Sequence, residues 1–263
     1  MTYHVAIDIG ASSGRVILAK TAGKLEIREI HRFKNGFTKC NGHDRWNINH
    51  LIDEILFGLE KVKSCGVDTC TIGIDTWAVD YVLLDENDDL LADPIAYRDA
   101  RTQGVMTKVF EKISKDEIYQ KTGIQFLNFN TLYQLCAEDR ELLAKTKTIL
   151  MIPDYIAYRL TGKKVGEVTN ASTTQYLNIH SRSYDKDLLD LAGVDSGKLP
   201  ELIETGKVIG KLSSDLYAKY DLPEATVVAV ATHDTASAVV GVPAVNKNWA
   251  YLSSGTWSLM RVE

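Results

Sequence analysis

Hydrophobic and polar positions along the first 90 residues predict three strands, one helix and two further strands. Apolar residues between Ile48 and Val62 recur at helical spacing, with Asn47 or Asn49 as the N-cap and Gly66 as the stop. Short apolar or alternating stretches predict strands at residues 5–9, 16–19, 25–33, 70–75 and 79–84. Tight turns join the first three, so we expect an antiparallel meander.

The remainder of the chain alternates predicted helices and strands. Helical patterns cover residues 102–113, 114–121, 130–139, 154–160, a short piece near 215 and an Ala-rich stretch at 235–240. Strands are predicted at 148–151, near 208, at 225–231, at 249–253 and at 256–262, and the polar stretch 169–174 is a loop or a helix start. Residues 241–243 and 246–248 are typical of a linker. This order predicts an α/β fold with a mixed sheet.

Composition and charge exclude several classes of protein. The chain has 263 residues, of which 45% are hydrophobic and 25% charged, as in globular proteins and unlike disordered or fibrous ones. No stretch is apolar enough to span a bilayer, and the N-terminus lacks the features of a signal peptide, so we expect a cytoplasmic protein. The net charge of −5 and the scattered Lys and Arg argue against nucleic acid. The four cysteines match no zinc spacing and are expected to be free thiols.

Two small turns rich in glycine and hydroxyl groups are candidate phosphate sites. In the stretch from Asp8 to Arg15, glycine and serine let backbone amides approach an anion, and Asp8 could hold Mg²⁺ through water. No Walker loop is present, and a glycine-rich hairpin with an Asp–Arg pair is the alternative. The turn at 254–256 is similar, and its alternative is a plain turn.

Asp234 lies between the apolar strand at 225–231 and the Ala-rich helix. Sheets of this class bind ligands at the carboxyl ends of their parallel strands, where an aspartate can act as a general base. The alternative is that Asp234 caps the helix, and His233 is then an ordinary polar neighbour.

Three further polar stretches could contact a sugar. Residues 73–81 offer Asp75, Thr76, Trp77 and Asp80 between two strands, which suits sugar hydroxyls and ring faces, and the alternative is a hairpin with a buried Trp. Residues 97–101 could add polar contacts, and the alternative is a solvated helix start. Residues 125–130 could add further polar contacts, and the alternative is an ordinary loop with capping side chains.

Taken in order, these motifs resemble the FGGY carbohydrate kinases over the whole chain. The matching segments are AIDIGASSGRV, IGIDTWAVDYVLLD, AYRDARTQG, IYQKTGIQFLNFNTLYQL, MIPDYIAYRLTG, EVTNASTTQ, VAVATHDTASAV and AYLSSGTWSLM. The GIQFL–FNTLYQL, THDTASAV and AYLSSGTWSLM segments are typical of the subfamily that converts L-rhamnulose to L-rhamnulose 1-phosphate.

The resemblance implies a ribonuclease-H-like domain of the actin and hexokinase type, with ATP and Mg²⁺ as cofactors and a small sugar as substrate. Asp234 then corresponds to the catalytic base, and Asp8 to the residue associated with Mg²⁺. The implied ATP contacts are Asp8, Ala11, Ser12, Ser13, Gly14, Arg15 and Thr256. The implied sugar contacts are Ala78, His233 and Thr235; the family commonly has glycine at the position of Ala78, where a methyl group could trim the pocket.

Family members are nearly twice this length, so the resemblance implies a complete first domain at 1–245 and only the opening hairpin of a second at 246–263. A chain without the rest of the second domain is expected to bind sugar weakly, to have little kinase activity alone, and to expose hairpin edges that favour a homodimer. Two other functions stay open. One is a kinase for another ketose or polyol, such as L-fuculose or D-xylulose, and the other is a non-catalytic sugar-binding module.

Overall fold

The computed structural model describes residues 2–245, 249–254 and 258–262, and a six-stranded mixed sheet forms its centre. The strands lie in the order β13-β14-β6-β1-β2-β3. They are β1 (Thr2–Ile9), β2 (Ser13–Thr21), β3 (Leu25–Lys34), β6 (Thr69–Thr76), β13 (Val208–Lys211) and β14 (Glu224–Val228). The predicted meander is confirmed, because β2 pairs antiparallel with both β1 and β3. β6 runs parallel to β1 and to β14, so three parallel strands lie side by side.

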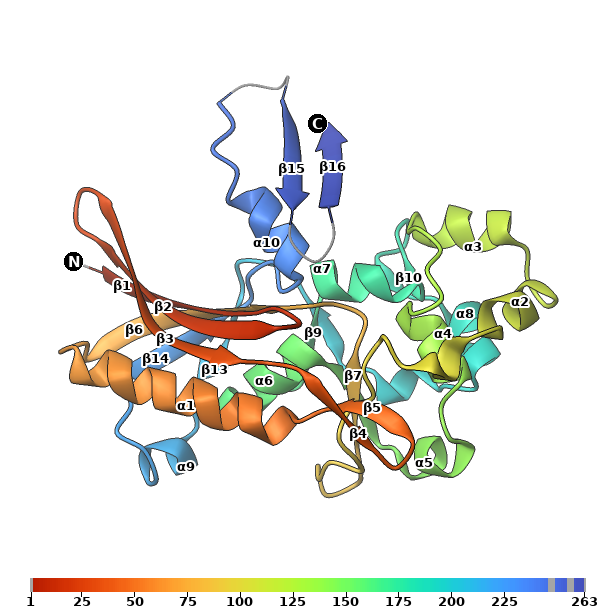
Figure 1. Cartoon of the computed structure of the whole chain (residues 1–263), viewed down its shortest axis with the longest axis horizontal. Helices are drawn as coiled ribbons and strands as arrows, with labels where there is room; N and C mark the ends of the chain where they lie inside the picture. Colours follow the sequence, from red (N-terminus) through yellow and green to blue (C-terminus); the bar gives the residue numbers. More distant parts are fainter. Residues whose placement is uncertain (1, 246–248, 255–257, 263) are drawn as a thin grey trace.

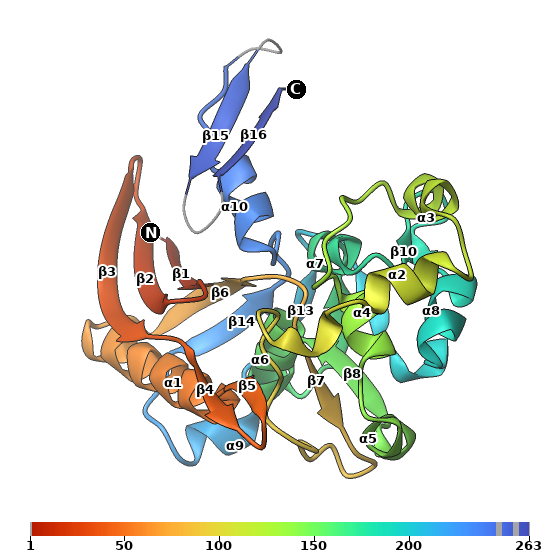
Figure 2. The same ribbon diagram turned by 45° about the vertical axis from the view of Figure 1, so that its right-hand side comes forward.

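Helices cover both faces of this sheet. Figures 1 and 2 show α1 (Ile48–Ser64) and α6 (Ile152–Thr161) on one face and α10 (Asp234–Val240) on the other. α1 buries its apolar stripe against β2 and β3, and Gly58 permits the close approach, because a Cβ there would lie 2.5 Å from Val16. Its N-cap is Asn47, whose side chain accepts a hydrogen bond from the His50 amide at 3.0 Å.

A second hydrophobic cluster lies beside the sheet and is mainly helical (Figure 2). Its elements include α2 (Val105–Phe110), α3 (Lys115–Thr122), α4 (Thr131–Cys136), α5 (Arg140–Lys145), α8 (Lys186–Ala192), β7 (Tyr81–Leu84) and β8 (Thr148–Met151). β7 pairs with β8 in a separate two-stranded sheet. The buried side chains of this cluster include Tyr133, Leu188 and Ile149.

Small elements complete the described part of the chain. Its other paired strands are β4 (Phe37–Cys40) with β5 (His43–Trp46), β9 (Val165–Glu167) with β12 (Glu201–Ile203), and β10 (Leu177–Asn178) with β11 (Ser183–Tyr184). The short helices are α7 (Val168–Ala171) and α9 (Ser214–Tyr217), with 3₁₀ turns at Ala100–Thr102, Ser172–Thr174 and Ser196–Lys198.

Two predicted elements are shorter than their apolar patterns. The predicted helix at 102–113 is divided, because Gly104 has a left-handed φ of 74° between the 3₁₀ turn and α2. The predicted strand at 79–84 begins only at Tyr81, because Val79 has a φ of 69°. This conformation is rare for a β-branched residue, and the Val79 carbonyl is held there by Thr131 and Gln134. The cysteines are free thiols, as predicted.

The last described strands form a separate hairpin that projects from the sheet (Figure 1). β15 (Ala250–Ser254) pairs antiparallel with β16 (Ser258–Val262), and β15 packs beside α10. The Leu252 and Met260 side chains are exposed. In the described ranges, no helix has both the length and the apolar character needed to cross a bilayer.

Candidate active site

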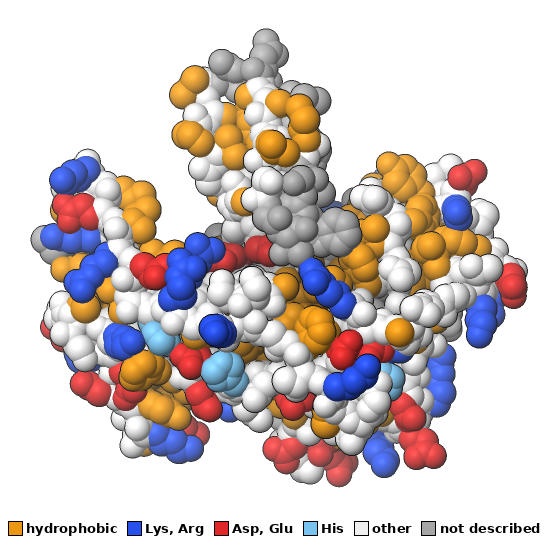
Figure 3. All heavy atoms as spheres, in the orientation of Figure 1, with side chains coloured by type: hydrophobic (Ala, Val, Ile, Leu, Met, Phe, Trp, Pro, Cys, Tyr) orange, Lys and Arg blue, Asp and Glu red, His pale blue; other side chains and the backbone are white. Residues whose placement is uncertain are grey.

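Three parallel strands end at one edge of the sheet, and acidic side chains gather there. Asp8 near the end of β1 lies in register with Asp75 of β6. The chain that follows β14 continues along the same edge, because Thr76 forms a parallel bridge with His233. Asp234 is the next residue, so the topology brings these side chains to the carboxyl edge, where α/β sheets bind ligands. Figure 3 shows acidic side chains beside Lys and Arg on this face, at the foot of β15 and β16.

The turn between β1 and β2 is held open toward solvent by its own backbone and by one asparagine. The Gly10 amide donates to the Ser13 carbonyl at 2.9 Å. Asn35, the residue after β3, braces the turn: its side-chain amide donates to the Gly10 carbonyl at 2.8 Å and its backbone amide to the Ser12 carbonyl at 3.0 Å. Ser12 is exposed and Ala11 is half-buried. The turn is therefore open to an anion at the exposed Ser12.

The residues that follow the turn are packed tightly. A Cβ on Gly14 would lie 2.1 Å from the ring of Phe33, so any larger residue would have to displace that ring. Arg15 donates to the Asp8 carboxylate at 2.6 Å, and both side chains are partly exposed. The Asp–Arg pair of the alternative interpretation is thus present, but it lies at the ligand edge of the sheet.

Asp234 does not cap α10. His233 occupies the N-cap position and makes no side-chain capping bond, whereas Asp234 is the first helical residue. Its Oδ1 accepts hydrogen bonds from the Thr235 amide at 2.6 Å and from the Thr235 hydroxyl at 3.2 Å. The His233 Nε2 lies 3.4 Å from the same oxygen. The capping alternative is therefore wrong, and the Asp234 side chain, which is 38% exposed, is accessible.

Electrostatic repulsion couples the carboxyl groups of this edge. Burial raises the pKa of Asp75 to about 8, with further contributions from the charges of Asp8 and Asp234, while a hydrogen bond from Ser237 and the charge of Arg15 oppose the rise. Such a group retains a proton at neutral pH. A bound cation would relieve this repulsion.

The same factors act on the residues at the start of α10. Burial raises the pKa of Asp234, and the neighbouring His233 and the bonds from Thr235 oppose the rise. Burial also lowers the pKa of His233, despite its acidic neighbours. Asp234 is therefore a better proton acceptor than an ordinary exposed aspartate, as a general base requires.

Most of the predicted sugar cluster at 73–81 is structural. Asp80 is buried and accepts hydrogen bonds from the indole nitrogens of Trp46 at 2.6 Å and Trp77 at 2.9 Å. The two indole rings pack with their centroids 4.3 Å apart. Thr76 is also fully buried. The Trp is buried, as the hairpin alternative held, but β6 and β7 belong to different sheets and form no hairpin. Ala78 and Asp75 remain partly accessible.

The candidate stretches at 97–101 and 125–130 likewise contain both buried structural residues and accessible ones. Tyr97 is buried, with its ring 5.2 Å from that of Phe129, and its hydroxyl accepts from Nε of the exposed Arg98 at 3.0 Å. Asn130 is buried and donates to the Gln125 carbonyl at 2.8 Å. Only Arg98 of this group presents a charged side chain to solvent.

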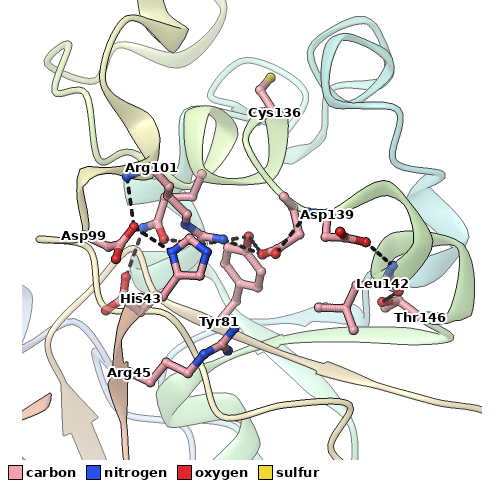
Figure 4. A network of polar contacts seen from close by, with 12 residues as sticks. His43, Arg45, Tyr81, Asp99, Arg101, Cys136, Asp139, Leu142 and Thr146 are labelled. Atoms are coloured by element: carbon pink, nitrogen blue, oxygen red, sulfur yellow. Dashed lines mark hydrogen bonds and ion pairs between the residues drawn. The ribbon is translucent and has the colours of Figure 1, made fainter. Parts of the chain in front are cut away.

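A network of hydrogen bonds and ion pairs lies beside this region (Figure 4). Arg101 donates to Glu138 at 2.7 Å and lies within 3.4 Å of the Tyr81 hydroxyl, and both members of the ion pair are 6% exposed. Asp99 accepts from the ring of His43 at 3.1 Å. A pocket of about 500 Å³ borders the network. Arg101 of the 97–101 stretch lines it, but among the described residues the implied ATP, sugar and catalytic contacts do not. The network therefore braces residues 97–101.

The remaining predicted features are the phosphate contact Thr256 and a Mg²⁺ site at Asp8. Thr256 lies outside the described residues. Within those residues, no set of three or more His, Cys, Asp and Glu side chains is arranged to hold a metal ion. Asp8 and Asp75 are hard oxygen donors of the kind that bind Mg²⁺ through water and substrate phosphates, so the donor chemistry fits a cation that arrives with a nucleotide. Asp75 was predicted only as one of the candidate sugar contacts at 73–81, and not as a catalytic residue or an ATP contact; its register with Asp8 was the missing information.

Comparison with known proteins places these observations in a family. The model of the FGGY family of carbohydrate kinases, N-terminal domain, matches residues 3–241. A rhamnulokinase of Ligilactobacillus salivarius is 58% identical over 100% of this chain and 54% of its own length. A rhamnulokinase of Bacillus subtilis is 56% identical over 99% of this chain and 54% of its own length. The chain thus spans about half the length of the curated relatives it matches.

Solved structures confirm the predicted fold. A ligand-bound xylulose kinase from Lactobacillus acidophilus superposes with a TM-score of 0.87 at 21% identity, over 100% of this chain and 54% of that one. A glycerol kinase from Plasmodium falciparum, solved with ADP, gives 0.81 at 20% identity, over 99% and 54%. At this identity the likeness establishes the actin- and hexokinase-like architecture.

Proposed function

Because the chain belongs to the FGGY family of carbohydrate kinases, we propose that it forms the sugar-binding, proton-accepting part of an ATP-dependent kinase that converts L-rhamnulose to L-rhamnulose 1-phosphate. The observation that carries the proposal is the position of Asp234. Its accessible carboxyl group, with a raised pKa, lies at the carboxyl edge of the sheet and within the electrostatic influence of Asp8 and Asp75. The high identity to two rhamnulokinases supports the choice of sugar.

Each group at this edge has one task in the proposed reaction. Asp234 accepts the proton of the sugar hydroxyl that attacks the γ-phosphorus of ATP, and the P–O bond to the leaving ADP breaks. Ala78, His233 and Thr235 orient the sugar, and residues 11–15 hold the phosphates with backbone amides, serine hydroxyls and Arg15. Mg²⁺ associated with Asp8 would supply charge neutralisation for the transferring phosphoryl group.

The proposed active site needs a second domain. We propose that residues 1–245 form the first domain and that 246–263, including Thr256 as a further phosphate contact, open the second. The match of the family model to residues 3–241 supports this boundary. Since phosphoryl transfer depends on charges placed on both sides of the phosphates, this chain alone should show little turnover.

A kinase assay with a fusion protein tests the proposal. In the fusion protein, residues 1–263 are followed by the second half of the Bacillus subtilis relative. We expect ATP-dependent phosphorylation of L-rhamnulose by the fusion protein and at most traces by this chain. Faster turnover of L-fuculose or D-xylulose than of L-rhamnulose would favour a kinase for another sugar. Sugar binding without nucleotide binding or turnover would favour the non-catalytic module.

A further inference from the structure

A buried glutamate lies behind the turn that carries Asp234. Glu167 ends β9 and has no exposed surface. One of its oxygens, Oε2, accepts five hydrogen bonds, from the amide and hydroxyl of Thr169, the amide of Asn170, and the amide and hydroxyl of Thr232. The other oxygen accepts from the Thr205 hydroxyl at 2.8 Å. A carboxylate is the side chain that can accept this many donors, because an ionised carboxyl group only accepts.

Thr232 is the point at which this network meets the site. Its amide and hydroxyl donate to Glu167 at 3.1 Å and 2.9 Å. Its carbonyl accepts from the Thr76 amide at 2.9 Å and from the Asn170 side chain at 3.4 Å. Every polar group of Thr232 is therefore bound, two residues before Asp234.

The network extends away from the site to the N-terminus of α6. The Glu167 amide donates to the Asp154 carboxyl group at 3.1 Å. Burial, and then the charge of Glu167, raise the pKa of Asp154 well above its usual value, although the bond from the Glu167 amide opposes this. Burial thus favours the protonated form of Asp154, which does not repel Glu167. The connection runs from α6 through Glu167 to Thr232 and the start of α10.

We propose that Glu167 is a positioning residue, whose carboxylate fixes Thr232 and thereby the direction in which Asp234 projects from the sheet edge. The physical reason is the strength of its bonds. Hydrogen bonds to an ionised acceptor are about twice as strong as neutral ones, and Thr232 contributes two of them. The inference rests on the proposed function, because a general base needs a fixed orientation toward the sugar hydroxyl.

Local hydrogen exchange in this chain tests the positioning without any activity. In Glu167→Gln, an amide oxygen replaces the carboxylate with little change in shape. We expect the Thr232 amide to exchange at least tenfold faster, while the sheet amides of Ile7 and Ile72 are unchanged. The matched control is Thr205→Val, which removes the bond to the other carboxylate oxygen and should alter Thr232 exchange less than twofold.

A second readout on the same samples is the titration of His233, followed by NMR. The charges of Asp234 and Glu167 raise the pKa of His233 against the effect of burial. Removal of the Glu167 charge should therefore lower this pKa, whereas a general loss of stability should not. Unchanged Thr232 exchange in Glu167→Gln, or equal acceleration at all sheet amides, would overturn the proposal.

If Glu167→Gln does not fold, hydrogen exchange in the Thr232→Val variant tests the positioning role of Glu167 instead. This substitution removes the hydroxyl bond and retains the backbone bond, so the Thr232 amide should exchange several-fold faster; no change would contradict the inference. In the fusion protein, Glu167→Gln should lower kcat and raise KM for L-rhamnulose while KM for ATP stays constant. A fusion protein without turnover would refute the proposed function, while the exchange and titration results would still decide the role of Glu167.

Discussion

Replacing Asp75 by asparagine removes a carboxyl group whose ionised form is opposed by its surroundings. In the folded chain the pKa of Asp75 is about 8, against an ordinary value of 3.8. The folded state therefore binds a proton more tightly than the unfolded state, and stability decreases as the pH rises from about 4 to about 8. Above pH 8 the ionised group destabilises the fold by its full amount.

The size of the destabilisation follows from the difference between the pKa of Asp75 in the folded chain and its ordinary value. About four pH units at 1.36 kcal/mol each give an upper limit of about 6 kcal/mol. Because Asp75 is only half-buried in the fold, solvent screens part of this energy, and we expect about 2–3 kcal/mol. Asp75→Asn should therefore be more stable than the wild type by this amount at pH 9 and equally stable at pH 4.

Urea denaturation at both pH values measures the difference. The matched control is Asp53→Asn, which changes an exposed carboxylate on α1 and should show no such dependence on pH. Equal stability of Asp75→Asn and the wild type at pH 9 would refute the reasoning, because it would mean that the Asp75 carboxylate is not opposed by burial or by Asp8 and Asp234.

Three further predictions concern packing and assembly. Arg101→Met should destabilise the fold by about 3–5 kcal/mol in thermal or urea unfolding, because it leaves Glu138 buried without its partner, and Arg101→Met with Glu138→Leu should recover most of that loss. Gly14→Ala should cost about 1–3 kcal/mol, because its methyl group would overlap the ring of Phe33; an unchanged Tm would contradict that geometry. The exposed edges of β15 and β16 should favour a homodimer in light scattering, and Leu252→Asp should shift it toward monomer, whereas a monomeric wild type would contradict the idea.

The parts of the fold that follow from local patterns could be predicted. The β1–β3 meander and α1 have clear periodicity, and the structure confirms them. The β4–β5 hairpin and α5 and α8 were not predicted, because they are short and are stabilised by tertiary packing.

The site could be predicted only in part. Asp234 stands at the end of an apolar strand, which is a local signal, whereas Asp75 gains its role from a strand register that no local pattern shows. Asp80 was expected to face a sugar, yet two buried indoles and Gln134 use its oxygens. Glu167 begins the matching segment EVTNASTTQ, but its role was not predicted, because its partners Thr205 and Thr232 are distant in sequence.

The measurement that tests the central claim most directly is phosphorylation of L-rhamnulose by the fusion protein and by its Asp234→Asn variant, with sugar binding measured by calorimetry. Asparagine keeps the size of the side chain but cannot accept the proton. We predict that kcat falls by about 10²- to 10⁴-fold while the affinity for L-rhamnulose stays within a few-fold. An Asp234→Asn variant that turns over L-rhamnulose at nearly the wild-type rate would contradict the account.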